Sequence, residues 1–388
     1  FIMKFKWLIQ DVGLIQSQIN RKFEALDFMN ENFNVIGVMA DYDYITNLEN
    51  VLEEDLNTIY IVLGGVKILN LLNKADSIKD IIEFPTQFQI DNSDSILKSL
   101  KQGYFYNFKN FDQAYYGTLN LPLLNSSADY LPLKDNLDTF FDVDKFIKPS
   151  RDLKAFDAGI LEAGKTLNEF VLNQKRQRFY LEENIVVSNL RNILDEYRFF
   201  VVNDEVVTGS AYRRNTVVGE DRYIPLDIQD KAIEYAKLYQ PADVFTMDLA
   251  KTDDNEISIL EYNCFNCSGV YLCDLVKTFN SIKNLFLNIF IFFFFKICLT
   301  KEKPLECRPL DGTARIKLFF FILCLYKIFF FSTMPAENPA ISNLPFEYVL
   351  GISAVSPPTN SQSEILHPLT TPFKSDFNFF KSILFIEI

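Results

Sequence analysis

The composition of the chain changes sharply near residue 284, and this change decides which part can fold into a packed domain. The 104 residues from Leu285 to Ile388 hold 18 of the 39 phenylalanines and 9 of the 15 prolines. They carry nine basic and eight acidic residues, whereas residues 1–284 carry 29 basic and 43 acidic ones, a net charge of −14. The acidity therefore belongs to the first 284 residues, a length that allows about one to three domains.

Net charge and histidine content exclude several classes of function. The longest basic runs are Lys175-Arg176 and Arg213-Arg214. A general nucleic-acid binder is not expected, because neutralising phosphates requires larger basic clusters. The single histidine, His367, has no second histidine with which to build a His-rich zinc site, and a His-based triad is not expected either. Chemistry must therefore rely on Lys, Arg, Asp, Glu, Asn or Cys.

The cysteines favour a reducing compartment. All six lie beyond residue 263, which is not the pattern of a secreted disulfide framework. Residues 3–12 are too mixed in polarity for a secretory signal, so we expect a cytoplasmic protein. Cys264 and Cys267 form a CxxC pattern, but zinc needs four ligands and no second CxxC follows. We interpret the pair as incidental, with a redox role as the alternative.

Two stretches of the tail are strongly apolar, Leu285–Leu299 and Ile316–Phe331. A membrane-spanning helix needs about 20 mostly apolar residues, and both stretches are shorter and contain lysine. Phe/Ile/Leu/Lys-rich sequence is also what an AT-rich non-coding stretch yields when translated, and we favour this interpretation for residues 285–331. The alternative is a membrane hairpin. Residues 332–388 are rich in Pro, Ser and Thr and are predicted to be disordered.

The first 125 residues predict a small α/β domain. Three apolar runs have the length of strands: Phe5–Gln10, Asn34–Met39 and Ile59–Gly64. Between the first two runs, Ser17–Asn30 carries apolar residues at helical spacing. Alternating strands and helices favour a parallel sheet. Polar residues beginning at Asn125 mark the boundary, so the domain is expected to cover residues 3–125.

Residues 126–284 predict a second domain of the α+β class. A strand is expected over Phe140–Lys148, and helices over Leu161–Leu172 and Ile228–Leu238. Two antiparallel hairpins are expected because paired apolar runs flank Asn/Asp turns. They comprise Glu196–Val202 with Val206–Tyr212, and Val244–Ala250 with Ile257–Asn263.

The second hairpin carries three oxygen-bearing side chains that are expected to converge. If it turns at Asp254-Asn255, Asp248 lies opposite Glu261, and Asn263 shares their face because strand side chains alternate. Opposed carboxylates on a buried face repel unless a cation lies between them. Carboxylate and amide oxygens suit magnesium. The alternative is a polar, solvated hairpin face.

Magnesium with few protein ligands usually accompanies phosphates, which attract basic residues. Candidate basic residues end strands or follow them: Lys148, Arg151, Lys154, Arg198, Arg213 and Arg214. Arg198 lies within an otherwise apolar strand and must be paired to be tolerated there. Its alternative role is a structural salt bridge to Glu196 or Asp248.

These motifs, in this order, resemble the ATP-grasp superfamily. The series is Glu196-Tyr-Arg-Phe-Phe-Val-Val, Gly209-Ser-Ala-Tyr-Arg213, Met247-Asp248-Leu, Ile259-Leu-Glu261-Tyr-Asn263 and Ser268-Gly269. The likeness covers residues 140–281 and is to uncharacterised ATP-grasp domain-containing proteins and, more distantly, to ribosomal-protein glutamate ligases. It implies an ATP-grasp fold, two α+β subdomains around ATP, over residues 126–284, with the α/β domain as a pre-ATP-grasp domain.

The resemblance also implies roles for single residues. Lys148 and Lys154 would hold the ATP phosphates, and Arg198 and Arg213 would contact the γ-phosphate or an acylphosphate. The adenine hinge would lie near Val186–Ser188. The residues implied at each position are Val187 and Ser188 for adenine, and Asp248, Glu261 and Asn263 for Mg²⁺.

The activity implied is that of an ATP-dependent ligase. Such an enzyme activates a carboxylate as an acylphosphate, which an amine or thiol then attacks. Phosphoryl transfer of this kind depends on positioning and on charge neutralisation, so a shortage of histidine is no obstacle. The acceptor is expected to be a small molecule or peptide that the sequence does not identify. The alternative is a catalytically silent nucleotide-binding protein tethered to a membrane by the apolar tail.

Overall fold

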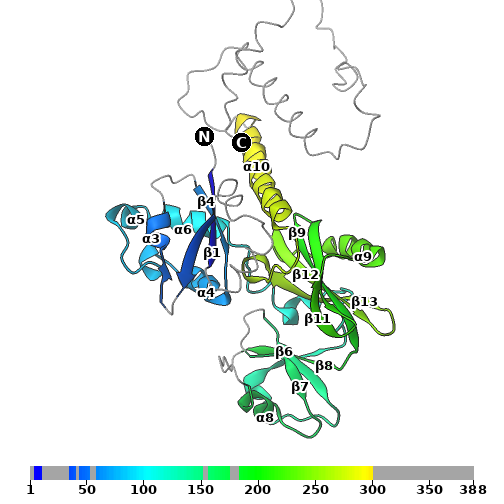
Figure 1. Cartoon of the computed structure of the whole chain (residues 1–388). Helices are drawn as coiled ribbons and strands as arrows, with labels where there is room; N and C mark the ends of the chain where they lie inside the picture. The colour runs from blue at the N-terminus through cyan, green and yellow to red at the C-terminus, as the bar shows by residue number, and fades with distance from the viewer. Residues whose placement is uncertain are drawn as a thin grey trace, which may run out of the picture. The chain divides into compact units, whose positions relative to one another are not determined.

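The computed structural model describes residues 4–10, 35–40, 43–52, 58–151, 156–174 and 183–299 (Figure 1). The chain forms two compact units, residues 1–302 and 303–388, and the described residues all belong to the first. Several predictions therefore fall outside the described residues: the helix over Ser17–Asn30, the phosphate contact of Lys154, the apolar stretch Ile316–Phe331 and the disordered segment 332–388.

The N-terminal sheet is parallel, as the alternation of strands and helices predicted. Its order is β3-β2-β1-β4, and β1 pairs in parallel with both β2 and β4. The strands are β1 (Lys4–Gln10), β2 (Val35–Ala40), β3 (Ile45–Thr46) and β4 (Thr58–Leu63). All six residues of β4 are buried, as expected of a parallel strand covered on both faces.

Side-chain alternation divides the N-terminal sheet between two cores. Leu8, Tyr60 and Val62 pack with the helices of this region, whereas Trp7 and Ile61 face a second core shared with the C-terminal half of the molecule. The helical segments here are α3 (Leu48–Val51), α4 (Val66–Lys74), η1 (Ile78–Asp80), α5 (Gln87–Asp91), α6 (Ser93–Gln102) and α7 (Gln113–Tyr116).

A four-stranded antiparallel sheet follows, in the order β5-β8-β6-β7. Its elements are β5 (Asp129–Pro132), η2 (Leu133–Asp135), β6 (Lys145–Pro149), β7 (Gly159–Leu161), α8 (Leu167–Leu172) and β8 (Asn184–Asn189). Two predictions need correction. The strand expected from Phe140 begins only at Lys145, and the helix expected from Leu161 begins at Leu167. Leu161 instead pairs with β6, and Thr166 caps the helix through a reciprocal bond with Glu169.

A five-stranded antiparallel sheet contains both predicted hairpins. Its order is β11-β10-β9-β12-β13. The strands are β9 (Ile193–Val202), β10 (Glu205–Arg214), β11 (Val217–Asp221), β12 (Val244–Thr252) and β13 (Ile257–Cys264). The first hairpin turns at Asn203 and Asp204, as predicted, and both have positive φ, which the right-handed twist of a two-residue hairpin favours.

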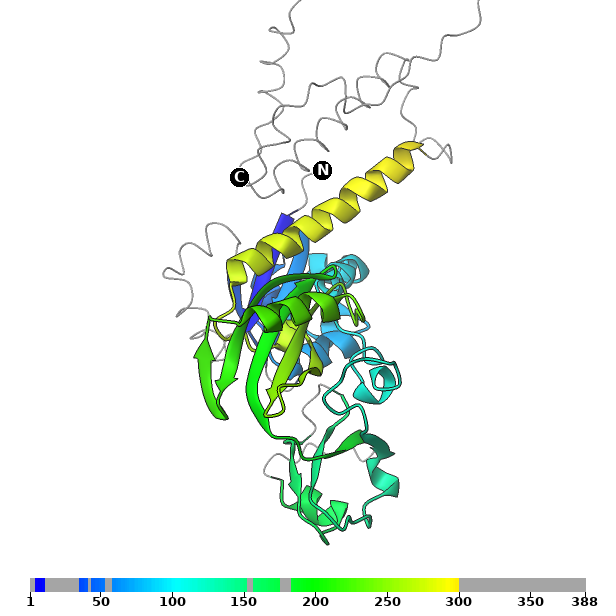
Figure 2. The same ribbon diagram turned by 90° about the vertical axis from the view of Figure 1, so that its right-hand side faces the viewer.

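Three further elements complete the described fold: α9 (Leu226–Ala236), η3 (Phe265–Cys267) and α10 (Leu275–Leu299). The two long helices pack on different faces of the five-stranded sheet. Ile228 of α9 packs with Phe199 and Met247, while Phe279 of α10 packs in the core that holds Phe200. Figure 2 shows α10 continuing past the sheets.

The first apolar stretch of the tail lies within α10. This helix begins before residue 284 and runs to Leu299, and its first half is anchored by Phe279, whose ring stacks on Trp7 at 3.6 Å between centroids. Across the described ranges, the helices fall short of the length and hydrophobicity that spanning a membrane requires.

Two contacts connect the N-terminal region to the five-stranded sheet. At the outer edge of β13, Ile259 donates to the Pro122 carbonyl (2.8 Å) and accepts from the Leu124 N–H (2.9 Å). Beyond the end of β13, the fully buried Asn266 side chain donates to the carbonyls of Val62 (2.6 Å) and Gly103 (2.8 Å) and accepts from the Phe105 N–H (2.7 Å). We call Asn266 and these three partners the fastening cluster.

Candidate functional site

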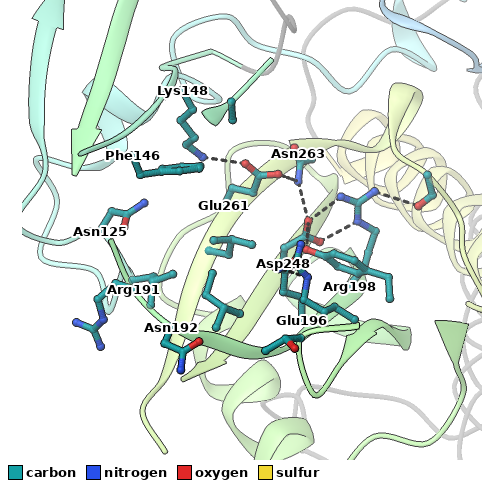
Figure 3. Close-up of a pocket in the computed structure, with 18 of the residues that line it drawn as sticks. Asn125, Phe146, Lys148, Arg191, Asn192, Glu196, Arg198, Asp248, Glu261 and Asn263 are labelled. Carbon is teal, nitrogen blue, oxygen red and sulfur yellow. Dashed lines mark hydrogen bonds and ion pairs between the residues drawn. The ribbon is translucent and has the colours of Figure 1, made fainter. Parts of the chain in front are cut away.

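A cavity of about 790 Å³ is lined by residues of the second and third sheets (Figure 3). Phe146 and Lys148 come from β6, Arg198 from β9, and Asp248 and Glu261 from β12 and β13. The volume lies in the range of pockets that enclose a cofactor or substrate. Because the residues come from separate sheets, the cavity depends on how the two sheets are held together.

The predicted register of the second hairpin is confirmed where it matters for this cavity. Asp248 pairs directly with Glu261, and Asn263 pairs with Thr246 two positions further along. A bulge follows, because Leu249 pairs with Ile259 and leaves Leu260 unmatched. The bulge keeps Ile259 in the apolar core beneath the sheet while Glu261 lines the cavity.

Arg198 and Asp248 form a buried bidentate ion pair. Arg198 Nε and Nη2 donate to the two Asp248 oxygens at 2.8 and 2.6 Å, and Nη1 donates to the Gly269 carbonyl at 3.1 Å. The rings of Tyr212 and Tyr271 stack on each other at 4.8 Å, and the guanidinium lies 5.0 Å from the Tyr271 centroid. The salt bridge to Asp248 that the sequence left open for Arg198 is therefore present.

Lys148 and Glu261 form the second ion pair of the cavity, with Nζ donating to Oε2 at 2.8 Å. Asn263 links the two pairs, since its Nδ2 donates to Asp248 at 3.2 Å and to Glu261 at 3.1 Å (Figure 3). We call these five residues, Lys148, Arg198, Asp248, Glu261 and Asn263, the carboxylate cluster. Two positive and two negative charges balance within it.

Burial and charge act in opposite directions on the carboxyl groups of this cluster. Desolvation raises the pKa of Glu261, but Lys148 and Arg198 outweigh it, and the pKa falls to about 2. Desolvation raises the pKa of Asp248, and the Arg198 guanidinium opposes that rise. Desolvation together with the Asp248 charge also raises the pKa of the Tyr212 hydroxyl, which therefore stays protonated.

The donor set of the cluster suits a hard cation. Two carboxylates and one amide, Asp248, Glu261 and Asn263, offer oxygen ligands, which Mg²⁺ prefers. Within the part of the chain that the structure describes, no three His, Cys, Asp or Glu side chains gather closely enough to hold a metal by themselves. A cation here would complete its coordination with water or with oxygens of a ligand, as Mg²⁺ commonly does.

The remaining predicted site residues are placed unevenly. Arg213 lines the cavity and pairs with Glu196 at 3.1 Å. Val187 and Ser188 are buried within β8, with Val187 in the core of the second sheet. The cavity is lined instead by the residues that follow them: Asn189, Leu190, Arg191, Asn192 and Ile193. The predicted hinge is thus displaced toward the C-terminus by two to five residues.

Several cavity residues escaped the sequence analysis. Glu196, Tyr212 and Tyr271 line the cavity beside the carboxylate cluster, and desolvation raises the pKa of Glu196. A polar interruption between two apolar strands, Asn189 to Asn192, marked the connecting segment in the sequence. Tyr271 has a positive φ of 43°, which a non-glycine residue rarely adopts and which no sequence pattern announced.

Comparisons with known proteins agree with this fold. A scan against protein families matches residues 137–280 to a family described as an ATP-grasp domain, the second family of its clade. Comparison with curated proteins finds no match. Many solved structures match, among them a D-alanine–D-alanine ligase from Bacillus anthracis, with 11% identity, coverage of 74% of this chain and 98% of that chain, and a TM-score of 0.43.

Two further solved structures have similar statistics. The ATP-grasp ligase PsnB, complexed with a minimal precursor, shares 10% identity over 74% of this chain and 99% of that chain, with a TM-score of 0.39. The D-cycloserine synthetase DcsG shares 8% identity over 73% of this chain and 100% of that chain, with a TM-score of 0.42. The family match and the observed α+β architecture together lead to one conclusion: the chain contains an ATP-grasp domain.

Proposed function

We propose that this protein is a Mg²⁺-dependent ATP-grasp ligase, which activates a carboxylate as an acylphosphate for attack by an amine or thiol. The observation that carries the proposal is the carboxylate cluster, in which Asp248, Glu261 and Asn263 converge on a cavity inside an ATP-grasp domain. Such convergence on one sheet face is costly without a charge to balance it. An acceptor remains to be identified as a small molecule or a peptide.

The cavity offers distinct surroundings for the parts of a nucleotide. Apolar side chains that suit an adenine ring come from Phe146, Ile160 and Leu190. Cationic groups that suit phosphates come from Lys148 and Arg213. Adjacent apolar and charged linings of this kind match the chemistry of ATP.

The residues would divide the work of phosphoryl transfer. Asp248, Glu261 and Asn263 would hold Mg²⁺, which when bound neutralises charge on the transferring phosphoryl group. Lys148 would neutralise phosphate oxygens directly, and Arg198 would fix the Asp248 carboxylate in place through its two hydrogen bonds. Positioning and charge neutralisation supply most of the rate in this chemistry, so a side-chain general base is not required.

Calorimetry with the full chain tests the nucleotide site. We expect wild-type protein to bind ATP more tightly with Mg²⁺ than with EDTA, and Glu261→Gln or Asp248→Asn to lose at least about tenfold of that Mg²⁺-dependent affinity, since even outer-shell metal partners cost 10–100-fold. Glu205→Gln is the matched control, because Glu205 is an exposed carboxylate at the start of β10. Equal ATP affinity in all four proteins would contradict the site.

Product analysis tests the ligase activity itself. We expect ADP and phosphate to form from ATP when a suitable carboxylic acid and an amine or thiol are both supplied, and trapping with hydroxylamine to yield a hydroxamate from the acylphosphate. A protein that binds Mg²⁺-ATP but forms no ADP with any acid and acceptor mixture would support the catalytically silent alternative.

A further inference from the structure

The acidic side chains of the cavity already have cationic partners supplied by the protein. Glu261 is paired with Lys148 and Asp248 with Arg198, at 2.8 and 2.6 Å. A metal ion that approaches this cluster therefore meets a balanced set of charges and must displace a cation to bind. Which of the two cations can leave is decided by how each is held.

Arg198 is held as a permanent partner. Its guanidinium makes two hydrogen bonds to Asp248 and one to the Gly269 carbonyl, and it lies beside the Tyr271 ring. Arg198 and Asp248 are on neighbouring strands and pair directly across the sheet. Moving Arg198 away would leave a buried carboxylate without compensation, at a cost of several kcal/mol.

Lys148 is held far more loosely. Its Nζ bonds one oxygen of Glu261, whose side chain is 32% exposed, compared with 1% for Asp248. Lys148 also belongs to β6 of the other sheet, so its contact with Glu261 spans two sheets that share no strand. An ammonium group on a flexible stem can leave such a partner without breaking a sheet hydrogen bond.

Asn263 is oriented for this protein-balanced state. Its Nδ2 donates to both Asp248 and Glu261. A metal ion would require the amide oxygen instead, because a cation binds lone pairs and not N–H groups. The present orientation of Asn263 therefore belongs with Lys148 in the place of a cation.

We propose that Lys148 acts as a substitute for the metal ion: it neutralises Glu261 while the site is empty of nucleotide, then moves to the phosphates and frees Glu261 for Mg²⁺. This inference rests on the proposed function. It makes nucleotide and metal binding reciprocal, since each ligand raises the affinity for the other. It also separates the two cations, because Arg198 stays on Asp248 throughout.

One substitution should then change two affinities in opposite directions. In the nucleotide-free full chain, we expect Lys148→Met to bind Mn²⁺ about tenfold more tightly than wild type, measured by electron paramagnetic resonance, because a competing positive charge is removed from Glu261. The same variant should bind ATP more weakly. Lys145→Met is the matched control: Lys145 lies on the same strand, bonds the Asn189 amide at 2.7 Å, and should leave Mn²⁺ affinity unchanged.

Two further proteins keep the test decisive. Lys148→Gln should show the same gain as Lys148→Met, which covers the case in which one variant folds poorly. Adding Glu261→Gln to Lys148→Met should abolish the gain, because the freed carboxylate is the expected ligand. Equal Mn²⁺ affinity in wild type, Lys148→Met and Lys148→Gln would overturn the inference.

The outcome also separates this inference from the proposed function. If wild type binds ATP in a Mg²⁺-dependent manner but the Lys148 variants gain no Mn²⁺ affinity, only the substitute role of Lys148 fails. If wild type binds no ATP with Mg²⁺ present, the proposed function fails, and the inference fails with it.

Discussion

Asn263 and Asn266 lie three residues apart at the end of β13, and both are buried, yet their amides bind different kinds of partner. Asn266 bonds only backbone groups in the fastening cluster, at 2.6 to 2.8 Å. Asn263 bonds two carboxylates in the carboxylate cluster, at 3.1 and 3.2 Å. One amide connects two parts of the fold, and the other belongs to a group of charges that faces a cavity.

The difference shows how a structural polar group can be told from a functional one. A buried amide whose donors and acceptor are all satisfied by backbone has nothing left to offer a ligand. A buried amide whose partners are charged side chains stays in a set that a ligand can rearrange. Substitutions in the two clusters should therefore separate stability from binding.

The largest loss of stability is expected from Arg198→Met. This substitution leaves Asp248, which is 1% exposed, without its cationic partner, and breaking a buried pair costs about 3–5 kcal/mol. Urea denaturation measures the change in unfolding free energy. The double variant Arg198→Met/Asp248→Asn should recover part of the loss, and a single variant within about 1 kcal/mol of wild type would show that Asp248 is not charged in the folded protein.

Asn266→Ala should cost about 3 kcal/mol, because two carbonyls and one N–H are left buried without partners. Asn263→Ala should cost about 1 kcal/mol, since its partners face a cavity that water can enter. Thermal unfolding compares the two. Metal-dependent ATP binding should reverse the order, with Asn263→Ala impaired and folded Asn266→Ala unchanged; equal effects on binding would remove the distinction.

Acid should weaken the carboxylate cluster and leave the fastening cluster unaffected, because only the former contains titrating groups. The folded-state pKa of Glu261, about 2, lies below its ordinary value of 4.5. Its contribution is therefore complete above pH 4.5 and is lost as the pH falls from 4.5 toward 2. We expect Glu261→Gln to lose about 1–2 kcal/mol less stability than wild type over this range, a figure reduced for solvent screening. Parallel curves would contradict the assigned ion pair.

The smallest effect is expected where an ion pair faces solvent. Lys231 and Glu234 pair at 2.8 Å on α9, and both side chains are exposed. Lys231→Met should leave the unfolding midpoint unchanged within error, because exposed pairs gain little over their hydration. A clear drop would mean that ion-pair geometry, and not burial, decides the ranking of these variants.

Local sequence rules predicted the carboxylate face well. The turn at Asp254-Asn255 and the alternation of side chains were enough to place Asp248 opposite Glu261. The same rules predicted the turn at Asn203-Asp204. These features depend on neighbours within one hairpin, which a sequence displays directly.

Features that depend on distant segments were missed or misplaced. Lys148 meets Glu261 across 113 positions, so no local pattern reveals the pair. Leu161 has apolar neighbours at helical spacing, but pairing with β6 draws it into a strand. The cavity-lining segment after β8 lies beyond the predicted hinge because strand length depends on the partners β5 and β6.

The pairing of Pro122 and Leu124 with Ile259 has a consequence for the chain in solution. It leaves β13 without an open edge along this part, whereas β11, at the other side of the sheet, is exposed at every residue, with Val217 and Val218 outward. Unprotected edges recruit strands from other molecules. Self-association, where it occurs, should therefore begin at β11, and amide hydrogens near Ile259 should exchange late while those of β11 exchange early.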